Sequence, residues 1–157
     1  MATYLFTWNP QRFDWLEIDE AIAELEEAGW LDGGWSCGRN KSIQLGDRFF
    51  LIRLGYRTPN KGVVGSGVIT SEPYVGEHWE DEAGETSGSA MYVDVRFDAL
   101  LNAKIEKVLE IDVLKSDPLL SRMHWSSQTS GIRIPEPVAV ELQRRWSAFL
   151  EVGLPSP

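Results

Sequence analysis

The segment from Arg48 to Leu54 constrains the fold most, because it is the strongest strand signal in the chain. It reads RFFLIRL, a run of aromatic and aliphatic residues with no turn former. At 91–97, apolar residues at every second position alternate with polar ones, which predicts a strand with one buried face. Shorter strand patterns cover 4–8, 62–70 and 132–134. Core positions are expected at Phe49, Leu51, Val64, Val93 and Val95.

Helical spacing is confined to two segments near the ends of the chain. Residues 19–28 carry apolar side chains at helical spacing, and Gly29 is placed to end that helix. Pro135 and Pro137 open a second amphipathic helix, whereas 100–120 fits either helix or strand. We expect a single α+β domain over residues 1–157. It should have a curved, mainly antiparallel sheet or small barrel with flanking helices.

Charge is distributed unevenly along the chain. The net charge is −9, and eight acids with no base lie between 14 and 32. Between 39 and 61 the balance reverses, with six bases against Asp47. Lys and Arg neutralise phosphates, so this segment is a candidate nucleic-acid contact, although a solvated strand pair is the alternative. The residues expected at nucleic-acid phosphates are Arg39, Lys41, Arg57 and Lys61.

Several function classes find little support. Cys37 is the single cysteine, and His78 and His124 are the two histidines, without metal-ligand spacing. A Cys37–His pair stays open, but we expect no catalytic residue, no metal and no cofactor. No apolar run is long enough for a membrane span, and the N-terminus has no secretory pattern. We therefore expect a cytoplasmic protein without a membrane partner.

Seven tryptophans are the informative feature of the composition. Trp146, Trp15 and Trp30 accompany the helices and are expected in the core. Trp35 and Trp79 fall in segments that read as loops, a glycine-rich one at 33–40 and an acidic one at 74–89. A loop tryptophan either stacks on a planar ligand or folds back over the core. If it stacks, Trp35 should be dispensable for folding.

The order and spacing of five segments resemble EVE domains, members of the PUA-like group that bind modified bases. The resemblance runs from Tyr4 to about Trp146 and is closest to EVE modules that precede HNH nucleases in modification-dependent restriction enzymes. The segments are 4–10, 35–39, 46–48, 64–67, and 125–132 followed by the proline-started helix. The resemblance also implies a PUA-like fold, which has a curved sheet or small barrel with flanking helices of the kind expected above from the strand and helix patterns.

The resemblance implies a role for particular residues. Trp35 and Ser36 are similar to the base-pocket segment of YTH domains, so Trp35 would be one wall of an aromatic cage and Ser36 a polar reader. Trp79 or Tyr74 would supply the second wall, and Asn9 would lie near the base edge. Trp8, beside Asn9, completes the expected base-binding set.

The implied function is to flip and read a modified base in double-stranded DNA, 5-methyl- or 5-hydroxymethylcytosine above all. An HNH or other nuclease would then be a partner or a further domain, and this chain would have no catalysis of its own. Three alternatives stay open. They are a reader of modified RNA, a small ASCH-type hydrolase with neighbouring Lys, Thr and Glu side chains, and a protein-interaction module that uses Trp35 and Trp79.

Overall fold

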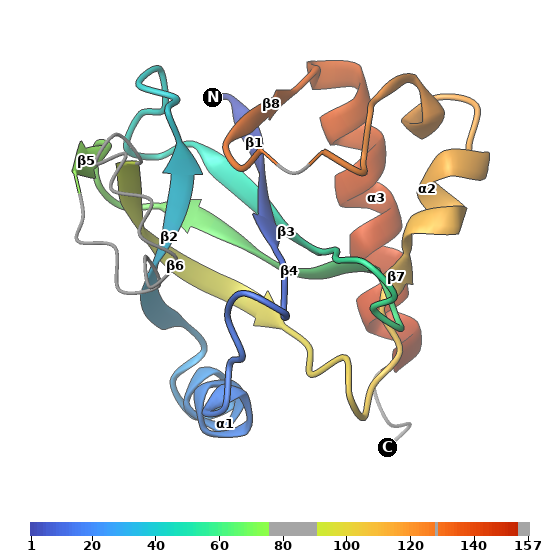
Figure 1. The fold of residues 1–157 in the computed structure, drawn as a ribbon, viewed down its shortest axis with the longest axis horizontal. Helices are drawn as coiled ribbons and strands as arrows, with labels where there is room; N and C mark the ends of the chain where they lie inside the picture. Colours follow the sequence, from blue (N-terminus) through green and yellow to red (C-terminus); the bar gives the residue numbers. More distant parts are fainter. Residues whose placement is uncertain (76–90, 128, 154–157) are drawn as a thin grey trace.

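The computed structural model describes residues 1–75, 91–127 and 129–153. Their strands form one sheet with the neighbour order β2-β6-β4-β3-β1-β8, to which β5 adds on β6 and β7 on β4 (Figure 1). The strands are β1 (Thr3–Trp8), β2 (Leu31–Gly38), β3 (Arg48–Arg53), β4 (Gly62–Ile69), β5 (Tyr74–Val75), β6 (Met91–Leu100), β7 (Leu109–Glu110) and β8 (Ile132–Ile134). The helices are α1 (Ile18–Ala28), α2 (Ile111–Ser116), α3 (Glu136–Gly153) and the short 3₁₀ turn η2 (Leu120–Arg122).

Most neighbouring strands of this sheet run antiparallel, and β1 and β3 form the parallel pair. Thr3 lies beside Arg48, and Trp8 lies beside Arg53. The chain between β1 and β3 contains α1 and β2, so it is long enough for the crossover that parallel strands need. The expected α+β class with a curved, mainly antiparallel sheet is confirmed.

Glycines and bulges curve the sheet. The β4–β6 register shifts between Ser66 and Gly67, and the β2–β6 register shifts between Ser36 and Gly38. A Cβ at Gly67 would collide with the carbonyl oxygen of Arg96, so β6 can approach β4 here only because this residue is glycine. Such irregularities bend a strand and increase its twist, which brings distant strands of one sheet toward each other.

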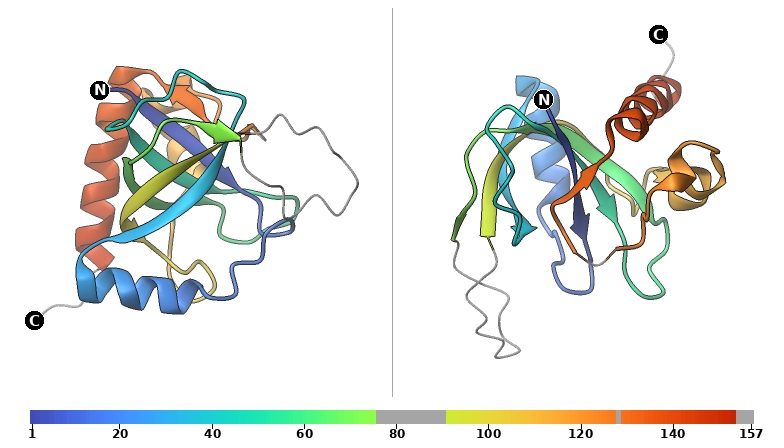
Figure 2. Two further views of the ribbon diagram at one scale, coloured as in Figure 1. Left: turned by 90° about the vertical axis from the view of Figure 1, so that its left-hand side faces the viewer. Right: turned by 90° about the horizontal axis from the view of Figure 1, so that it is seen from above.

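Apolar side chains pack on both faces of the sheet. The inner face buries the five expected core residues, Phe49, Leu51, Val64, Val93 and Val95, all with no exposed surface. The outer face at β3 and β1 packs against α3, η2 and the segment that follows. Figures 1 and 2 show α3 beside this face and α1 at one end of the sheet. Because β3 is covered on both faces, its sequence is apolar without alternation.

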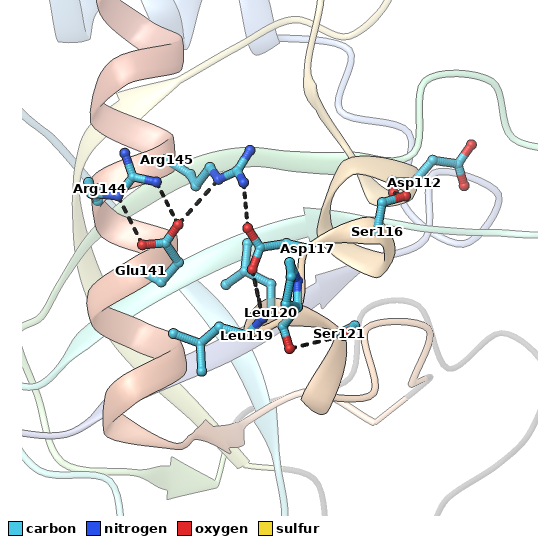
Figure 3. Close-up of polar contacts among 10 residues, drawn as sticks. Asp112, Ser116, Asp117, Leu119, Leu120, Ser121, Glu141, Arg144 and Arg145 are labelled. Atoms are coloured by element: carbon cyan, nitrogen blue, oxygen red, sulfur yellow. Dashed lines mark hydrogen bonds and ion pairs between the residues drawn. The ribbon is translucent and has the colours of Figure 1, made fainter.

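Two polar networks attach α3 to the rest of the molecule. Ser66 accepts a 2.9 Å hydrogen bond from the Trp146 indole and donates one to Asp98. Around Asp117, the backbone N–H groups of Leu119 and Leu120 donate to the carboxylate, as Figure 3 shows. Arg145 pairs with Asp117 and, at 3.3 Å, with Glu141, which also binds Arg144. The turn after α2 is thereby fixed to the middle of α3.

Some sequence expectations were wrong in detail. Residues 33–40 were expected as a loop, but 33–38 belong to β2, because β6 offers an antiparallel partner along this segment. Trp30, expected in the core, is 44% exposed, and the Arg96 guanidinium lies 4.1 Å from its ring centroid. The ambiguous segment 100–120 contains both β7 and α2.

The helix boundaries are largely those expected from sequence. Gly29 ends α1 in the left-handed conformation, with its N–H bonded to the Leu25 carbonyl oxygen. Among the described residues, no helix has the length and apolar character that crossing a bilayer requires.

Candidate functional site

Among the described residues, aromatic rings cluster on the inner face of the sheet near the end of β1. Trp8 ends β1, Phe13 and Trp15 belong to the following loop, Trp35 comes from β2, and Phe97 comes from β6. Phe97 and Trp8 are buried, whereas Phe13 is 37% exposed and Trp35 and Trp15 are half-buried. The cluster therefore extends from the core to the solvent, where its partly exposed rings can contact a ligand.

Trp35 is held firmly within this cluster. Its ring centroid lies 5.6 Å from Trp15, 5.9 Å from Phe13 and 6.4 Å from Trp8, and none of the three rings is parallel to it. Its indole Nε1 donates a 3.0 Å hydrogen bond to the carbonyl oxygen of Thr7. The ring is thus part of the packing between β2 and β1, and these contacts argue against the expectation that it is dispensable for folding, which a stability measurement must test.

The spacing of the rings limits where a base can stack. A base between two parallel rings needs about 7 Å between their planes, twice the ~3.4 Å rise of stacked bases. Trp15 and Trp35 are closer than that and inclined by 45°. A base can therefore stack on Trp35 only where Trp15 does not cover the Trp35 ring, or after Trp15 moves away.

Ser36 lies on the other side of β2 from Trp35, because successive residues of a strand project to opposite faces. Its hydroxyl oxygen accepts a hydrogen bond from the Gly38 N–H. Its carbonyl oxygen accepts a 2.6 Å hydrogen bond from the Ser130 hydroxyl, which itself accepts one from the Thr7 N–H. Ser130 thus bridges β1 and β2, a structural role that the sequence did not indicate.

Tyr74, one of the two candidates for the second wall, also lies on the outer face. It pairs with Tyr92 across β5 and β6, and its hydroxyl donates a 2.7 Å hydrogen bond to Asp94. That hydrogen bond, followed by burial, raises the pKa of Tyr74 to about 12. The structure does not bring Tyr74 next to Trp35. Trp79, the other candidate, lies outside the described residues.

Asn9 shapes the turn that follows β1. Its side-chain oxygen accepts the Gln11 N–H at 3.0 Å, and its carbonyl oxygen accepts the N–H groups of Arg12 and Phe13. Trp8 is fixed by the same turn, because its indole donates to the Phe13 carbonyl oxygen at 2.8 Å. The structure therefore brings Trp8, Asn9 and Trp35 to one end of β1.

The four basic residues expected at phosphates form two separate pairs. Arg39 and Lys41 are exposed in the loop that leads into β3, whereas Arg57 and Lys61 lie in the loop that leaves it (Figure 1). Arg57 stacks on the exposed Tyr56 ring at 5.1 Å. The Gln11 side chain donates to the Tyr56 carbonyl oxygen, which joins this second loop to the turn after β1. The loop that carries Arg57 and Lys61 is thus joined to the turn that fixes Trp8.

Arg53 is an important residue of the site that sequence reasoning counted only as one of several bases. It ends β3, is 6% exposed, and its guanidinium carbon lies 5.6 Å from the Trp8 ring centroid. Burial lowers its pKa. The sequence did contain a signal for this residue. The strand at 48–54 shows no alternation of polar and apolar residues, so neither of its faces is predicted to meet solvent, and an arginine at its end should be buried.

The Cys37–His alternative is not supported by the described residues. Cys37 has no exposed surface, its thiol faces the Asn40 carbonyl oxygen at 3.8 Å, and burial raises its pKa. His124 is exposed, and His78 lies outside the described residues. Within those residues no group of three His, Cys, Asp or Glu side chains is arranged to hold a metal.

Two clefts lie away from the aromatic cluster. A polar cleft of about 370 Å³ opens between the β3–β4 loop and α2, and its lining includes Thr58, Lys61 and Glu110. A second cleft, of about 180 Å³, lies between β1, β8 and α3 and includes Arg48 and Arg133. Neither of these two clefts is lined by Trp35.

Comparison with solved structures identifies the fold. A hypothetical protein from Leishmania major superposes with a TM-score of 0.63 at 18% identity, covering 96% of this chain and 97% of that one. Protein PSPTO5229 from Pseudomonas syringae has a TM-score of 0.58 at 20% identity, covering 98% and 100%. These likenesses show a shared fold. No protein-family model and no curated protein matches the sequence.

YTH domains are also among the structural neighbours. The YTH domain-containing protein mmi1, in a complex with RNA, has a TM-score of 0.47 at 13% identity, covering 98% of this chain and 88% of that one. A likeness at that level establishes no shared function. A functional assignment must therefore depend on this chain's own residues.

Proposed function

We propose that the chain is a binding module that holds a flipped, modified base of DNA against its aromatic cluster. The observation that carries the proposal is the half-buried Trp35 among Trp8, Phe13 and Trp15, with the exposed Arg57 in the loop joined to the turn after β1. Aromatic rings that reach the surface beside positive charge are the combination that binds unstacked bases. The preferred base is 5-methyl- or 5-hydroxymethylcytosine, as the EVE resemblance implies.

The energetics suit a sensor with a graded preference. Flipping a base out of a duplex costs a few kcal/mol, and stacking on an aromatic ring returns ~1–3 kcal/mol. Phosphate contacts from Arg57 and Lys61 would supply further affinity and make it depend on salt. Burial of one methyl group adds ~0.8 kcal/mol, about a fourfold preference. Gating by a nuclease partner or further domain, of the HNH class in this proposal, would sharpen that preference into modification-dependent restriction.

The first experiment is a binding panel. Duplexes of one sequence with cytosine, 5-methylcytosine, 5-hydroxymethylcytosine or N6-methyladenine at one position are titrated against the protein and against Trp35→Ala and Trp35→Phe. We expect tighter binding of a modified-cytosine duplex, lost in Trp35→Ala and largely kept in Trp35→Phe. Equal affinity for every duplex would reject base reading.

Two alternatives use the same cluster and are separated by competition. An RNA reader would prefer an RNA oligomer over the DNA oligomer of the same sequence, through contacts with the 2′-hydroxyl. A protein-interaction module would lose its partner in Trp35→Ala while keeping its affinity for DNA. We favour DNA because of the EVE resemblance.

A small hydrolase is the second candidate function, favoured by the polar cleft between the β3–β4 loop and α2. Thr58, Lys61 and Glu110 all line it, which are the three residue types expected of an ASCH-type site. In that case the purified protein should hydrolyse an amide or ester of a modified nucleoside, and Thr58→Ala should abolish the activity. Equal turnover by Thr58→Ala and the unmutated protein would exclude this cleft.

A further inference from the structure

The positive charge of Arg53 is buried and has no counter-ion among the described residues. Its Nη1 donates to the carbonyl oxygens of Pro59 and Asn60, the latter at 3.4 Å. Its Nε is buried and has no hydrogen-bond acceptor. No carboxylate of the described residues forms an ion pair with it, and its neighbour on the other side is the Trp8 ring. A buried donor without an acceptor is destabilising, so its presence calls for an explanation.

The position of Arg53 relates it to the aromatic cluster. It shares the inner face of β3 with Phe49 and Leu51, and it lies directly beside Trp8 in the parallel β1–β3 pair. Trp8 in turn contacts Trp35. The unpaired donor therefore lies at the same end of the sheet, on the same face, as the rings proposed to hold the base.

The residues around Arg53 hold it in place. Arg57 and Asn60, in the loop that supplies its carbonyl partners, both adopt a left-handed backbone conformation, with φ of 56° and 55°. Asn60 is fixed in turn by a 2.8 Å hydrogen bond from its side-chain nitrogen to the Ala103 carbonyl oxygen. The guanidinium is thus held in place by a structure that does not use its Nε.

We propose that Arg53 reads the acceptor edge of the bound base, donating its free N–H to a carbonyl oxygen or ring nitrogen of the flipped nucleotide. This inference rests on the proposed base-binding function and extends it to the chemical group recognised. Arginine only donates hydrogen bonds, so its target must be an acceptor. Cytosine and its 5-substituted forms present two adjacent acceptors, O2 and N3.

A base fits this position better than a phosphate does. A phosphate is stabilised by several donors or cations around it, whereas Arg53 has one unused buried donor and an apolar ring beside it. An exposed cation that suits a phosphate is available in the same loop at Arg57. Phosphate binding by Arg53 is therefore the outcome that the experiment must separate from base reading.

The test uses two base analogues with the unmutated protein. Duplexes carry 5-methylcytosine, its 3-deaza analogue, which lacks N3, or a 2-aminopyridine C-nucleoside, which lacks O2. We expect at least one analogue to bind about 10- to 100-fold more weakly than 5-methylcytosine, the effect of losing a hydrogen bond to a charged donor. If both analogues bind as tightly as 5-methylcytosine, the inference is overturned, even though the proposed function stands.

Variants provide the second arm. Arg53→Met should bind 5-methylcytosine and the weaker analogue alike, whereas Arg122→Met, which removes an exposed arginine from η2, should keep the discrimination. Arg53→Lys keeps the positive charge and replaces Arg53→Met in this experiment if Arg53→Met has a much lower unfolding temperature. If Arg53→Met weakens modified and unmodified duplexes by one factor and lowers the salt dependence, Arg53 contacts phosphate and the inference fails. If the unmutated protein binds no modified duplex in preference, the proposed function fails with it.

Discussion

The indole nitrogen of Trp35 in β2 is hydrogen-bonded to the carbonyl oxygen of Thr7 in β1, two strands that lie far apart in the order of the sheet. Ser130 makes a second link between the same strands. The curved sheet is therefore closed across its opening by side chains. Trp35 has two roles at this point, as a brace between strands and as a candidate surface for a base.

Replacement of Trp35 by alanine should consequently lower stability as well as binding. Truncation of a fully buried aromatic residue costs about 3–5 kcal/mol, and for this half-buried ring with one hydrogen bond we expect about 2 kcal/mol. Trp35→Phe should cost about 1 kcal/mol, because it keeps the ring and loses the hydrogen bond. Urea unfolding measures both. Unchanged stability in Trp35→Ala would mean that the aromatic cluster does not brace the sheet.

The separation of the basic residues into two pairs predicts unequal effects on DNA binding. Arg57→Gln should weaken binding to modified and unmodified duplexes alike. It should also reduce the slope of the logarithm of the binding constant against the logarithm of the salt concentration by about one. Arg39→Gln, at the other end of β3, should have the smaller effect. Anisotropy titrations at several salt concentrations compare the two. A change confined to modification preference in Arg57→Gln would disprove its phosphate role.

The hydroxyl of Ser66 is expected to be important for stability although it is remote from the aromatic cluster. Ser66 is 1% exposed and is hydrogen-bonded to both Trp146 and Asp98. Ser66→Ala leaves the buried indole N–H without an acceptor, which should cost about 1–3 kcal/mol. Ser121→Ala, at an exposed hydroxyl, is the matched control and should be close to neutral in urea unfolding. Equal effects of the two substitutions would contradict this account.

Acid should weaken the attachment of α2 and η2 to α3 through Asp117. Hydrogen bonds from the backbone N–H groups of Leu120 and Leu119, together with Arg145, lower the pKa of Asp117 below its ordinary value of 3.8. A carboxyl whose pKa is lower in the folded state stabilises the fold above its unfolded-state pKa. That contribution is lost as the pH falls through the folded-state value.

Asp117→Asn should therefore lose less stability than the unmutated protein when the pH is lowered from about 5 to about 2. Urea midpoints measured across that interval test this expectation. Asp112→Asn, whose exposed carboxylate in Figure 3 makes no contact with the other residues drawn, is the control and should follow the unmutated protein. Parallel curves for all three proteins would show that Asp117 does not titrate with folding.

Local patterns in the sequence were enough to predict much of the secondary structure and the core. The apolar run at 48–54 and the alternation at 91–97 became β3 and β6, and Gly29 ends α1 as expected. These signals are local because strand pleat and helix pitch repeat over a few residues. The aromatic content of the site was also visible in the sequence, as Trp8 and Trp35.

Only the tertiary structure decided which of those residues meet. The parallel β1–β3 pair places Arg53 beside Trp8, and the curvature of the sheet brings Trp35 to Thr7. Glycine content suggested a loop at 33–40, yet pairing with β6 made it a strand and so placed Ser36 on the face opposite Trp35. Strand pairing joins residues by long-range hydrogen bonds that no local pattern encodes. The sequence therefore determined the elements and the residue types of the site, whereas the pairing of strands determined its geometry.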